Sequence, residues 1–275
     1  MALTLTLLLT AALSAAAWLW GPPLWAEQRR LRVRRRPFPA AWRDVLRRRF
    51  PQFALLPADL QLQLKKHIQV FIAEKPFIGC NGLQVTDEMR VLVAAQASLL
   101  QLNRRAGMFP RLRQVLLYPG AFVVQRAQHG GAGLVHEGRQ VLLGESWQQG
   151  QVILSWDDAL AGAADPADGR NVVIHEFAHQ LDQESGPANG APFLGRRDRY
   201  ARWAATLNQA FGQLQRALAL GEATLIDAYG ATSPAEFFAV ASEVFFERPA
   251  ALASEQPALF DELTQFYRVN PLSWR

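Results

Sequence analysis

Residues 171–182 read Asn-Val-Val-Ile-His-Glu-Phe-Ala-His-Gln-Leu-Asp and contain the pattern HExxH, formed by His175, Glu176 and His179. Residues four apart lie on one face of an α-helix, so both imidazoles can reach the same metal ion. The valine, isoleucine, phenylalanine and leucine residues between them give the apolar cover that a central helix needs. The segment therefore predicts a buried helix that carries a metal site.

The residue types in this pattern favour zinc. Neutral imidazole nitrogens are common ligands of Zn2+. Glu176 lies beside the metal position and can take a proton from an activated water and return it to a leaving amine. The other histidines, His67, His129 and His136, have no comparable spacing. Surface histidines beside an unrelated glutamate are the alternative, which the apolar surroundings disfavour.

A hydrolytic zinc site usually has three protein ligands and a water molecule. No third histidine follows closely, so a glutamate on a later helix is expected. Glu236 and Glu243 are seven residues apart in a very apolar segment, where a buried carboxylate needs a strong partner. Glu236 also fits a capping box that begins at Ser233. Spacing alone leaves the ligand role open between the two glutamates.

The rest of the chain predicts an α+β domain. Half of the 275 residues are hydrophobic and 19% are charged, which excludes a disordered chain, a collagen and a polytopic membrane protein. Cys80 is the single cysteine, so a disulfide framework and a cysteine-based zinc ribbon are excluded as well. Helical patterns precede and follow a region of short predicted strands at 115–118, 122–124, 139–143 and 152–156.

The net charge of +5 divides unevenly along the chain. Residues 1–49 carry ten arginines against Glu27 and Asp44, a net charge of +8. The remaining 19 basic and 22 acidic residues give 50–275 a net charge of −3. A body with this charge has no electrostatic footprint for phosphate backbones, so no direct nucleic-acid binding is expected.

The basic part follows an uncharged leader. Residues 2–20 carry no charge, tryptophans gather near their end, and the arginine run 29–36 comes next. This order predicts one membrane-spanning helix with the body in the cytoplasm. We expect a hydrophobic anchor at 1–25, an arginine-rich juxtamembrane linker at 26–49 and a zinc peptidase domain at 50–275. A cleaved signal peptide and a buried helix of a soluble cytoplasmic protein are the alternatives.

Several separated motifs resemble one known family over roughly residues 50–272. The matching segments are Ser146–Gly150, Val152–Trp156, His175–Asp182, Asp227–Tyr229, Pro234–Val240 and Phe266–Leu272. Together they are similar to the MtfA (Mlc titration factor A) family of zinc peptidases. The resemblance implies a zincin-like domain of the gluzincin type, related in its catalytic core to anthrax lethal factor, in which helices flank a small mixed sheet.

The resemblance also implies roles for individual residues. It assigns one zinc ion to His175, His179 and Glu236, with Glu176 as the general base. It gives Tyr229 the role of stabilising the oxyanion through its phenol.

Three further roles remain open at this point. Glu243 becomes a carboxylate that supports the site. Asp182 is expected either to orient a ligand imidazole or to be an exposed helical residue. The strand at 152–156 is expected either to be an edge strand that pairs with extended substrate or to pack in the core.

The family implies aminopeptidase-like activity on peptides and binding of the repressor Mlc, which links its members to sugar uptake. The apolar leader departs from this pattern, because the family members compared are soluble. The predicted function is a zinc-dependent peptidase tethered at the inner membrane by a single pass, with a soluble cytoplasmic enzyme as the alternative location. A regulatory protein that sequesters a repressor, with a structural or vestigial zinc site, is the alternative function.

Overall fold

The structure is a computed structural model. It describes residues 24–104, 108–130, 134–142, 144–147 and 150–274, together with Thr4, Thr6 and Thr10. Between residues 122 and 149 it describes the backbone alone.

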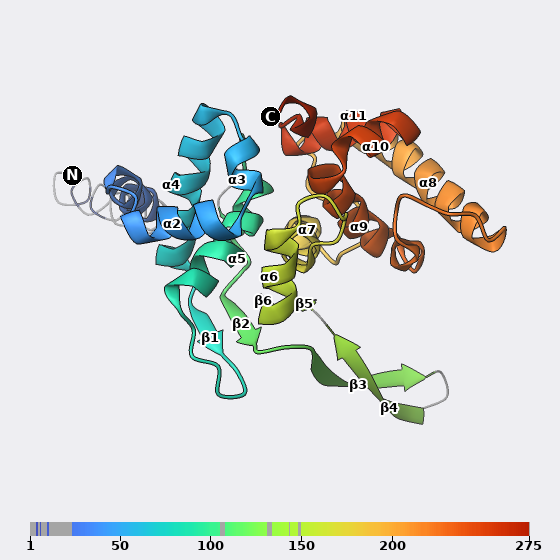
Figure 1. Ribbon diagram of the computed structural model, residues 1–275, viewed down its shortest axis with the longest axis horizontal. Coiled ribbons are helices and arrows are strands. Elements are labelled where there is room, and N and C mark those ends of the chain that lie inside the picture. Colours follow the sequence, from blue (N-terminus) through green and yellow to red (C-terminus); the bar gives the residue numbers. More distant parts are fainter. Residues whose placement is uncertain are drawn as a thin grey trace.

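A four-stranded mixed sheet lies among the helices (Figure 1). Its order is β1 (Phe77–Gly79), β2 (Gln114–Tyr118), β6 (Gln151–Ser155) and β5 (Gly144–Trp147). The first three strands are parallel, and β5 is antiparallel to β6. Parallel neighbours need a crossover connection, and the chain between β1 and β2 supplies one that contains a helix. A small mixed sheet with flanking helices was expected, and this α+β class is confirmed.

The prediction of an edge strand at 152–156 was wrong. The β6 strand pairs with β2 on one side and with β5 on the other, so both of its edges are occupied. The final residue of the predicted strand, Trp156, begins a helix instead. The outer position belongs to β5, a strand of four residues that is too short and too polar to stand out by pattern. The sequence pattern therefore did not reveal β5, which forms the edge of the sheet beside β6.

Helices form most of the remaining described chain. The first group is α2 (Ala40–Arg49), α3 (Gln52–Leu55), α4 (Ala58–Glu74) and α5 (Asp87–Leu99). After the sheet come α6 (Trp156–Ala164), α7 (Val172–Asp182) and α8 (Arg197–Ala219). The chain ends with α9 (Pro234–Glu247), α10 (Pro249–Glu255) and α11 (Pro257–Tyr267). In Figure 1 the antiparallel pair β3 (Phe122–Gly130) and β4 (Leu134–Leu142) extends away from this assembly.

The helix α7 lies between the two groups of helices and contacts α5, α6, α9, β5 and β6. Its apolar side chains are buried as the sequence predicts. The ring of Phe177 packs against Phe109 at 4.8 Å and against Phe71 at 5.6 Å between ring centroids. These contacts join α7 to α4 and to the segment before β2. The polar face of α7 is left to carry the histidines.

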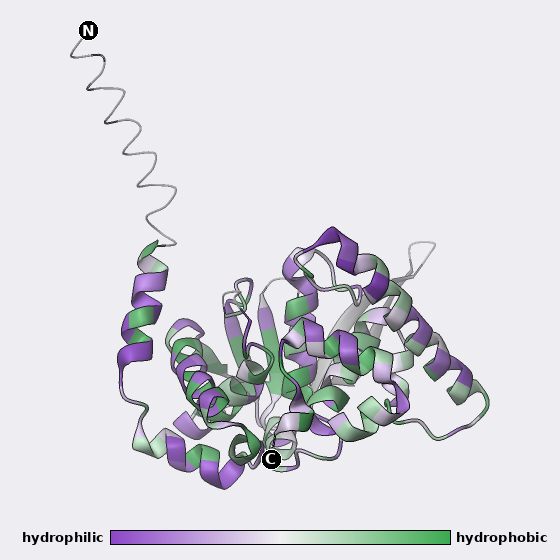
Figure 2. Ribbon diagram, turned by 90° about the horizontal axis from the view of Figure 1, so that it is seen from above, coloured by the Kyte–Doolittle hydropathy of each residue, from purple (hydrophilic) through white to green (hydrophobic). Residues whose placement is uncertain are grey.

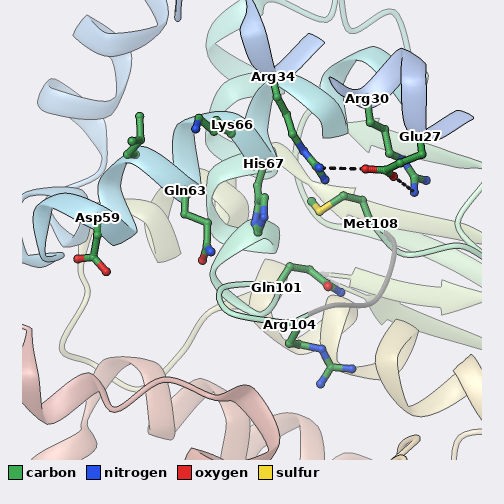
Figure 3. A pocket seen from close by; sticks show the side chains of 11 residues that line it. Glu27, Arg30, Arg34, Asp59, Gln63, Lys66, His67, Gln101, Arg104 and Met108 are labelled. Atoms are coloured by element: carbon green, nitrogen blue, oxygen red, sulfur yellow. Dashed lines mark hydrogen bonds and ion pairs between the residues drawn. The ribbon is translucent and has the colours of Figure 1, made fainter. Parts of the chain in front are cut away.

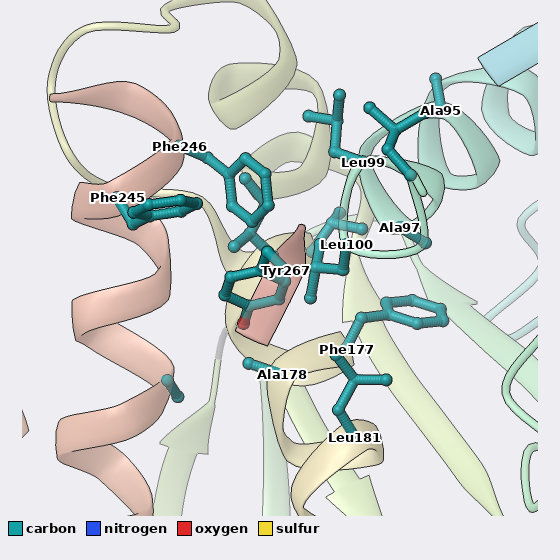
Figure 4. Packing of buried hydrophobic residues seen from close by; sticks show 14 of the residues in the cluster. Ala95, Ala97, Leu99, Leu100, Phe177, Ala178, Leu181, Phe245, Phe246 and Tyr267 are labelled. Carbon is teal, nitrogen blue, oxygen red and sulfur yellow. The ribbon is translucent and has the colours of Figure 1, made fainter. Parts of the chain in front are cut away.

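Aromatic side chains pack against the helix α9 (Figure 4). Tyr267 lies beside Phe245 and Phe246, with centroid distances of 5.5 and 4.9 Å. Its buried hydroxyl donates to Ser242 Oγ at 2.7 Å, and Ser242 donates in turn to the carbonyl of Phe238 at 2.7 Å. A buried tyrosine needs such a partner, and here the partner is on α9 itself. This packing fixes the rotation of α9 about its own axis.

The arginine-rich part of the chain is partly structured against the body. Residues 24–35 are helical, and Figure 2 shows them, mostly in purple, at the margin of the molecule. Arg30 makes two hydrogen bonds to the carboxylate of Glu74, and α2 buries Val45 and Leu46 in the core. The predicted boundary after residue 49 stays a prediction.

The predicted anchor at 1–25 lies almost entirely outside the described residues. Of this segment the structure describes Thr4, Thr6 and Thr10, then Leu24 and Trp25. Within the described part of the chain, no helix is both long enough and apolar enough to cross a bilayer.

Candidate metal centre

The helix that carries the HExxH pattern begins with a strong capping residue. The side chain of Asn171 accepts a hydrogen bond from the backbone N–H of Ile174 at 2.9 Å. It also donates to the carbonyl of Gly162 on α6 at 3.0 Å. An asparagine cap satisfies one of the free N–H groups of the first turn. The cap and the buried apolar face together fix where α7 starts and which way it is turned.

The structure brings His175, His179 and Glu236 together. His175 Nε2 lies 3.0 Å from Glu236 Oε2, and His179 Nε2 lies 3.2 Å from the same oxygen. The two Nε2 atoms are 3.2 Å apart. These residues form the one such cluster of possible metal ligands found among the described residues.

The geometry of this cluster suits a zinc ion. Bonds of about 2.0 Å at tetrahedral angles place neighbouring ligand atoms about 3.3 Å apart. The three separations of 3.0 to 3.2 Å are close to that value. Two imidazole nitrogens and one carboxylate oxygen are also a common donor set for catalytic zinc. The residues present therefore fit the ion.

Glu243 holds one of the imidazoles in place. Its Oε1 lies 2.8 Å from His175 Nδ1, and its Oε2 accepts a hydrogen bond from the backbone N–H of Asn171. A carboxylate at Nδ1 keeps the proton on that nitrogen and leaves Nε2 for a metal. The sequence left Glu236 and Glu243 equivalent as ligands. The structure turns Glu236 toward the two Nε2 atoms and Glu243 toward the opposite side of the His175 ring.

Two pKa shifts describe the electrostatics of the cluster. Burial opposes a charge on His175, but its contacts with Glu236 and Glu243 outweigh this and hold its pKa well above the ordinary value. Burial would raise the pKa of Glu236, yet hydrogen bonds with His175 and His179 hold it well below the ordinary value. Both shifts arise from the close pairing of the imidazoles with the carboxylates.

Only one of the two hydrogen bonds of the predicted capping box at Ser233 and Glu236 is formed. Ser233 Oγ accepts a hydrogen bond from the backbone N–H of Glu236 at 3.2 Å, so Ser233 does cap α9. The carboxylate of Glu236 faces the histidines instead of turning back to the backbone of Ser233. The cap thus positions the first turn of α9, and from this turn the side chain of Glu236 reaches α7.

The two predicted catalytic residues lie within the span of the chain that carries the cluster, Glu176 between the two histidines and Tyr229 just before Glu236. Glu176 is buried on α7, and its charge contributes to the raised pKa of His175. Tyr229 is in the short 3-10 turn η2 (Ala228–Ala231), with its ring centroid 5.9 Å from that of His175. Its side chain is 48% exposed, so the phenol is accessible to a substrate. Asp227 caps the turn by accepting from the Tyr229 N–H at 2.9 Å.

The structure contradicts one of the two roles expected for Asp182, and its role in orienting a ligand imidazole stays a prediction. It is completely buried, so the prediction of an exposed helical residue was wrong. Its Oδ2 accepts a hydrogen bond from the Gly190 N–H at 2.7 Å. Burial raises the pKa of Asp182, which the hydrogen bond from Gly190 and the charge of His179 oppose. The hydrogen bond from Gly190 ties the end of α7 to the following loop, and His179 interacts with the Asp182 carboxyl through its charge.

Sequence reasoning missed Glu247, although it lies on the same face of α9 as the other two glutamates. It accepts hydrogen bonds from Asn171 Nδ2 at 3.0 Å and from the Gly169 N–H at 3.1 Å. Burial raises the pKa of Glu247 to about 9, and the neighbouring carboxylates Asp168 and Glu243 contribute to the rise. The spacing of 236, 243 and 247 was a signal that could have identified it.

The profile of the family described as "Glucose-regulated metallo-peptidase M90" matches residues 24–268. The chain therefore belongs to this family of metallopeptidases, which implies a metal ion. The match also begins well before residue 50, at the helical residues that carry the arginines.

Individual curated proteins are similar to the chain over most of its length. "Mlc titration factor A" of Salmonella agona (strain SL483) is 39% identical over 233 residues, covering 84% of this chain and 86% of the relative. The protein of the same name from Serratia proteamaculans (strain 568) is 36% identical over 85% of this chain and 88% of its own length. An uncharacterized protein of Synechocystis sp. (strain ATCC 27184 / PCC 6803 / Kazusa) is 40% identical over 97% of both chains. The resemblance to the MtfA family is confirmed.

The raised pKa of Glu247 leads to a prediction about stability. The folded chain keeps a proton on this carboxyl, whereas the unfolded chain loses it above a pH of about 4.5. The parent therefore loses stability as the pH rises from about 4.5 toward about 9, by at most about 1.4 kcal/mol per pH unit. Glu247→Gln removes this titration. We expect the free energy of unfolding of the variant, minus that of the parent, to rise between about pH 5 and about pH 8.

Urea unfolding at a series of pH values measures this difference. Glu255→Gln is the matched control, because Glu255 is exposed on α10. A difference for Glu247→Gln that stays as flat as that of the control would contradict the prediction.

Proposed function

We propose that the chain is a zinc-dependent peptidase that hydrolyses peptide bonds with a water molecule as the nucleophile. The observation that carries the proposal is the approach of His175, His179 and Glu236 at separations suited to tetrahedral zinc. The fold supports it, because α7 and α9 place the three side chains from two helices packed against each other. The gluzincin type follows from a glutamate as third ligand.

The chain's own residues account for the proton transfers. A zinc ion held by the three ligands would supply Lewis-acid polarisation of the peptide carbonyl and lower the pKa of water. Glu176 accepts the proton of the attacking water and returns it to the leaving amine. Tyr229 donates a hydrogen bond from its phenol to the oxygen that becomes negative in the transition state. Glu243 orients His175 and sets the tautomer that ligation requires.

The substrate is proposed to bind in an extended form along β5. This strand is one of the two outer strands of the sheet, and it contacts α7, the helix that carries the histidines. We propose aminopeptidase-like activity as the finer assignment, on the basis of the family resemblance.

Replacing the general base tests the proposal. Glu176→Gln keeps the size of the side chain but removes its basicity, so peptide hydrolysis is expected to fall by about 10²- to 10⁴-fold. Zinc content, measured by atomic emission, is expected to equal that of the parent. Glu255→Gln, the same chemical change at an exposed position, is expected to keep full activity. Equal hydrolysis by Glu176→Gln and the parent, at equal zinc content, would exclude Glu176 as the base.

Binding of a transcriptional repressor is the second candidate function. It is favoured by the name of the Salmonella and Serratia relatives, which describes them as titration factors of Mlc. If binding uses a surface apart from the metal centre, His175→Ala abolishes zinc binding and hydrolysis but retains a Mlc-like repressor in a pull-down. Loss of the repressor together with the metal would show that the two functions share the site.

We propose in addition that residues 1–25 anchor the chain in the inner membrane, with residues 26–49 as the juxtamembrane part and the peptidase domain on the cytoplasmic side. The match to the Synechocystis relative leaves at most about eight residues of this chain outside, so it includes most of the apolar segment. The match to the Mlc titration factor A of Salmonella agona covers 84% of this chain.

Reporter fusions at the carboxyl end of the full chain test this topology. A fluorescent reporter is expected to be active and recovered with membranes, while an alkaline phosphatase fusion is expected to be inactive. Deletion of residues 1–25 is expected to release the fluorescent fusion from the membrane fraction. An active phosphatase fusion would place the domain on the opposite side, and recovery of the full-length fusion away from membranes would exclude the anchor.

A further inference from the structure

A cavity lies apart from the metal centre. It has a volume of about 550 Å3, is open to solvent on one side and is lined by the helical residues 24–35, by α4 and by the segment that follows α5 (Figure 3). Its lining includes none of the cluster His175, His179 and Glu236. The volume lies within the range of small-molecule sites, about 300–1,000 Å3, and exceeds what one inorganic ion needs.

Gln101 provides the first sign of a ligand. Its side chain lines the cavity and the residue is 1% exposed, yet neither its amide oxygen nor its amide nitrogen has a hydrogen-bond partner in the described part of the chain. A buried amide without partners destabilises the fold, because it has lost its hydrogen bonds to water and gained none in return. A group in the cavity that can both donate and accept would remove this cost.

His67 adds a second unused polar atom beside Gln101. In Figure 3 its ring lies between Arg34 and Gln101. Burial and the charge of Arg34 lower the pKa of His67 to about 4, against a hydrogen bond with the backbone of Ser98, so the ring is neutral near pH 7. Its Nδ1 is buried and has no hydrogen-bond partner among the residues that the structure describes. With the proton on the nitrogen that serves Ser98, Nδ1 is an acceptor and matches a hydroxyl group.

Four basic side chains line this cavity. The largely buried Arg104 lies 3.8 Å from the Glu184 carboxylate, donates to the Phe266 carbonyl at 3.4 Å and lies over the Phe266 ring. Lys66, from α4, is half-buried and makes no ion pair among the described residues. Arg30 and Arg34 enter from residues 24–35, where Glu27 pairs with them.

We propose that this cavity binds a phosphate group attached to a hydroxyl-bearing polyol. The phosphate oxygens accept charge-assisted hydrogen bonds from Lys66, and the hydroxyls pair with His67 and Gln101. Lys66 is the cation of the lining that has no ion pair among the described residues, whereas Arg30 and Arg34 pair with Glu74 and Glu27, and Arg104 lies beside Glu184. The ligand is either a soluble phosphorylated polyol or the glycerophosphate headgroup of an anionic lipid, which share this chemistry.

Calorimetric titration of the full chain with glycerol 3-phosphate tests the soluble source, with glycerol as the uncharged control. We expect saturable binding of glycerol 3-phosphate and none of glycerol. Treatment with a chelator is expected to leave the affinity unchanged, because the metal ligands do not line the cavity. This outcome is independent of the proposed peptidase activity.

Two variants assign the binding to the cavity. Lys66→Gln is expected to weaken binding by at least about tenfold, the loss of one charge-assisted contact. Lys65→Gln is the matched control, because the neighbouring Lys65 is equally half-buried on α4 but lies outside this cavity. Gln101→Leu is expected to weaken binding while leaving the ligand-free chain at least as stable as the parent, since it removes the unpaired amide.

Vesicles test the lipid source. The full chain is mixed with vesicles of phosphatidylglycerol in phosphatidylcholine, or of phosphatidylcholine alone, and the bound fraction is measured by flotation. If the headgroup is the ligand, Lys66→Gln reduces the preference for phosphatidylglycerol and Lys65→Gln does not. Binding of either source that depends on Lys66 and Gln101 supports the proposal. Absence of binding in both arms, or equal binding by the parent and Lys66→Gln, overturns it.

Discussion

The contact between the Glu243 carboxylate and α7 is the interaction on which the site depends. One oxygen lies against His175 Nδ1, and the other accepts the backbone N–H of Asn171 at the start of the same helix. A single side chain from α9 therefore fixes both the first turn of α7 and the ring orientation of its first histidine. Because a side chain spans only a short distance, the two helices must keep one register for both contacts to form. That register is also the one that places Glu236 between the two imidazoles.

Three glutamates on one face of α9 carry out different tasks because their surroundings differ. Glu236, at the first turn, faces two imidazoles and remains charged. Glu247, three turns later, is buried beside Asp168 and retains a proton to about pH 9. Glu243 lies between them and joins the two environments. Glu243 and Glu247 are buried and Glu236 is partly buried. Burial of carboxylates in an apolar helix is costly, and the aromatic packing of Phe245, Phe246 and Tyr267 stabilises the arrangement.

The amino-terminal arginines have more than one role in the molecule. Arg30 pairs with Glu74 on α4 and so connects residues 24–35 to the body. Arg34 and Lys66 contribute positive charge to a cavity that contains the unpaired amide of Gln101. Sequence reasoning interpreted the arginine run as a flank of a membrane helix. Since interactions across 44 residues leave no periodic signal, neither the pairing with Glu74 nor the cavity could be predicted from the pattern.

The sequence by itself determined the helical segments, the α+β class and the pairing of His175 with His179, because these follow from helical periodicity and local spacing. It also limited the third ligand to Glu236 or Glu243, and the family resemblance favoured Glu236. Only the tertiary structure decided which side of the His175 ring each glutamate faces, because residues seven apart on one helix differ only in what packs opposite them. The tertiary structure likewise gave the sheet edge to β5 and buried Asp182, since strand order and burial depend on contacts between segments distant in the chain.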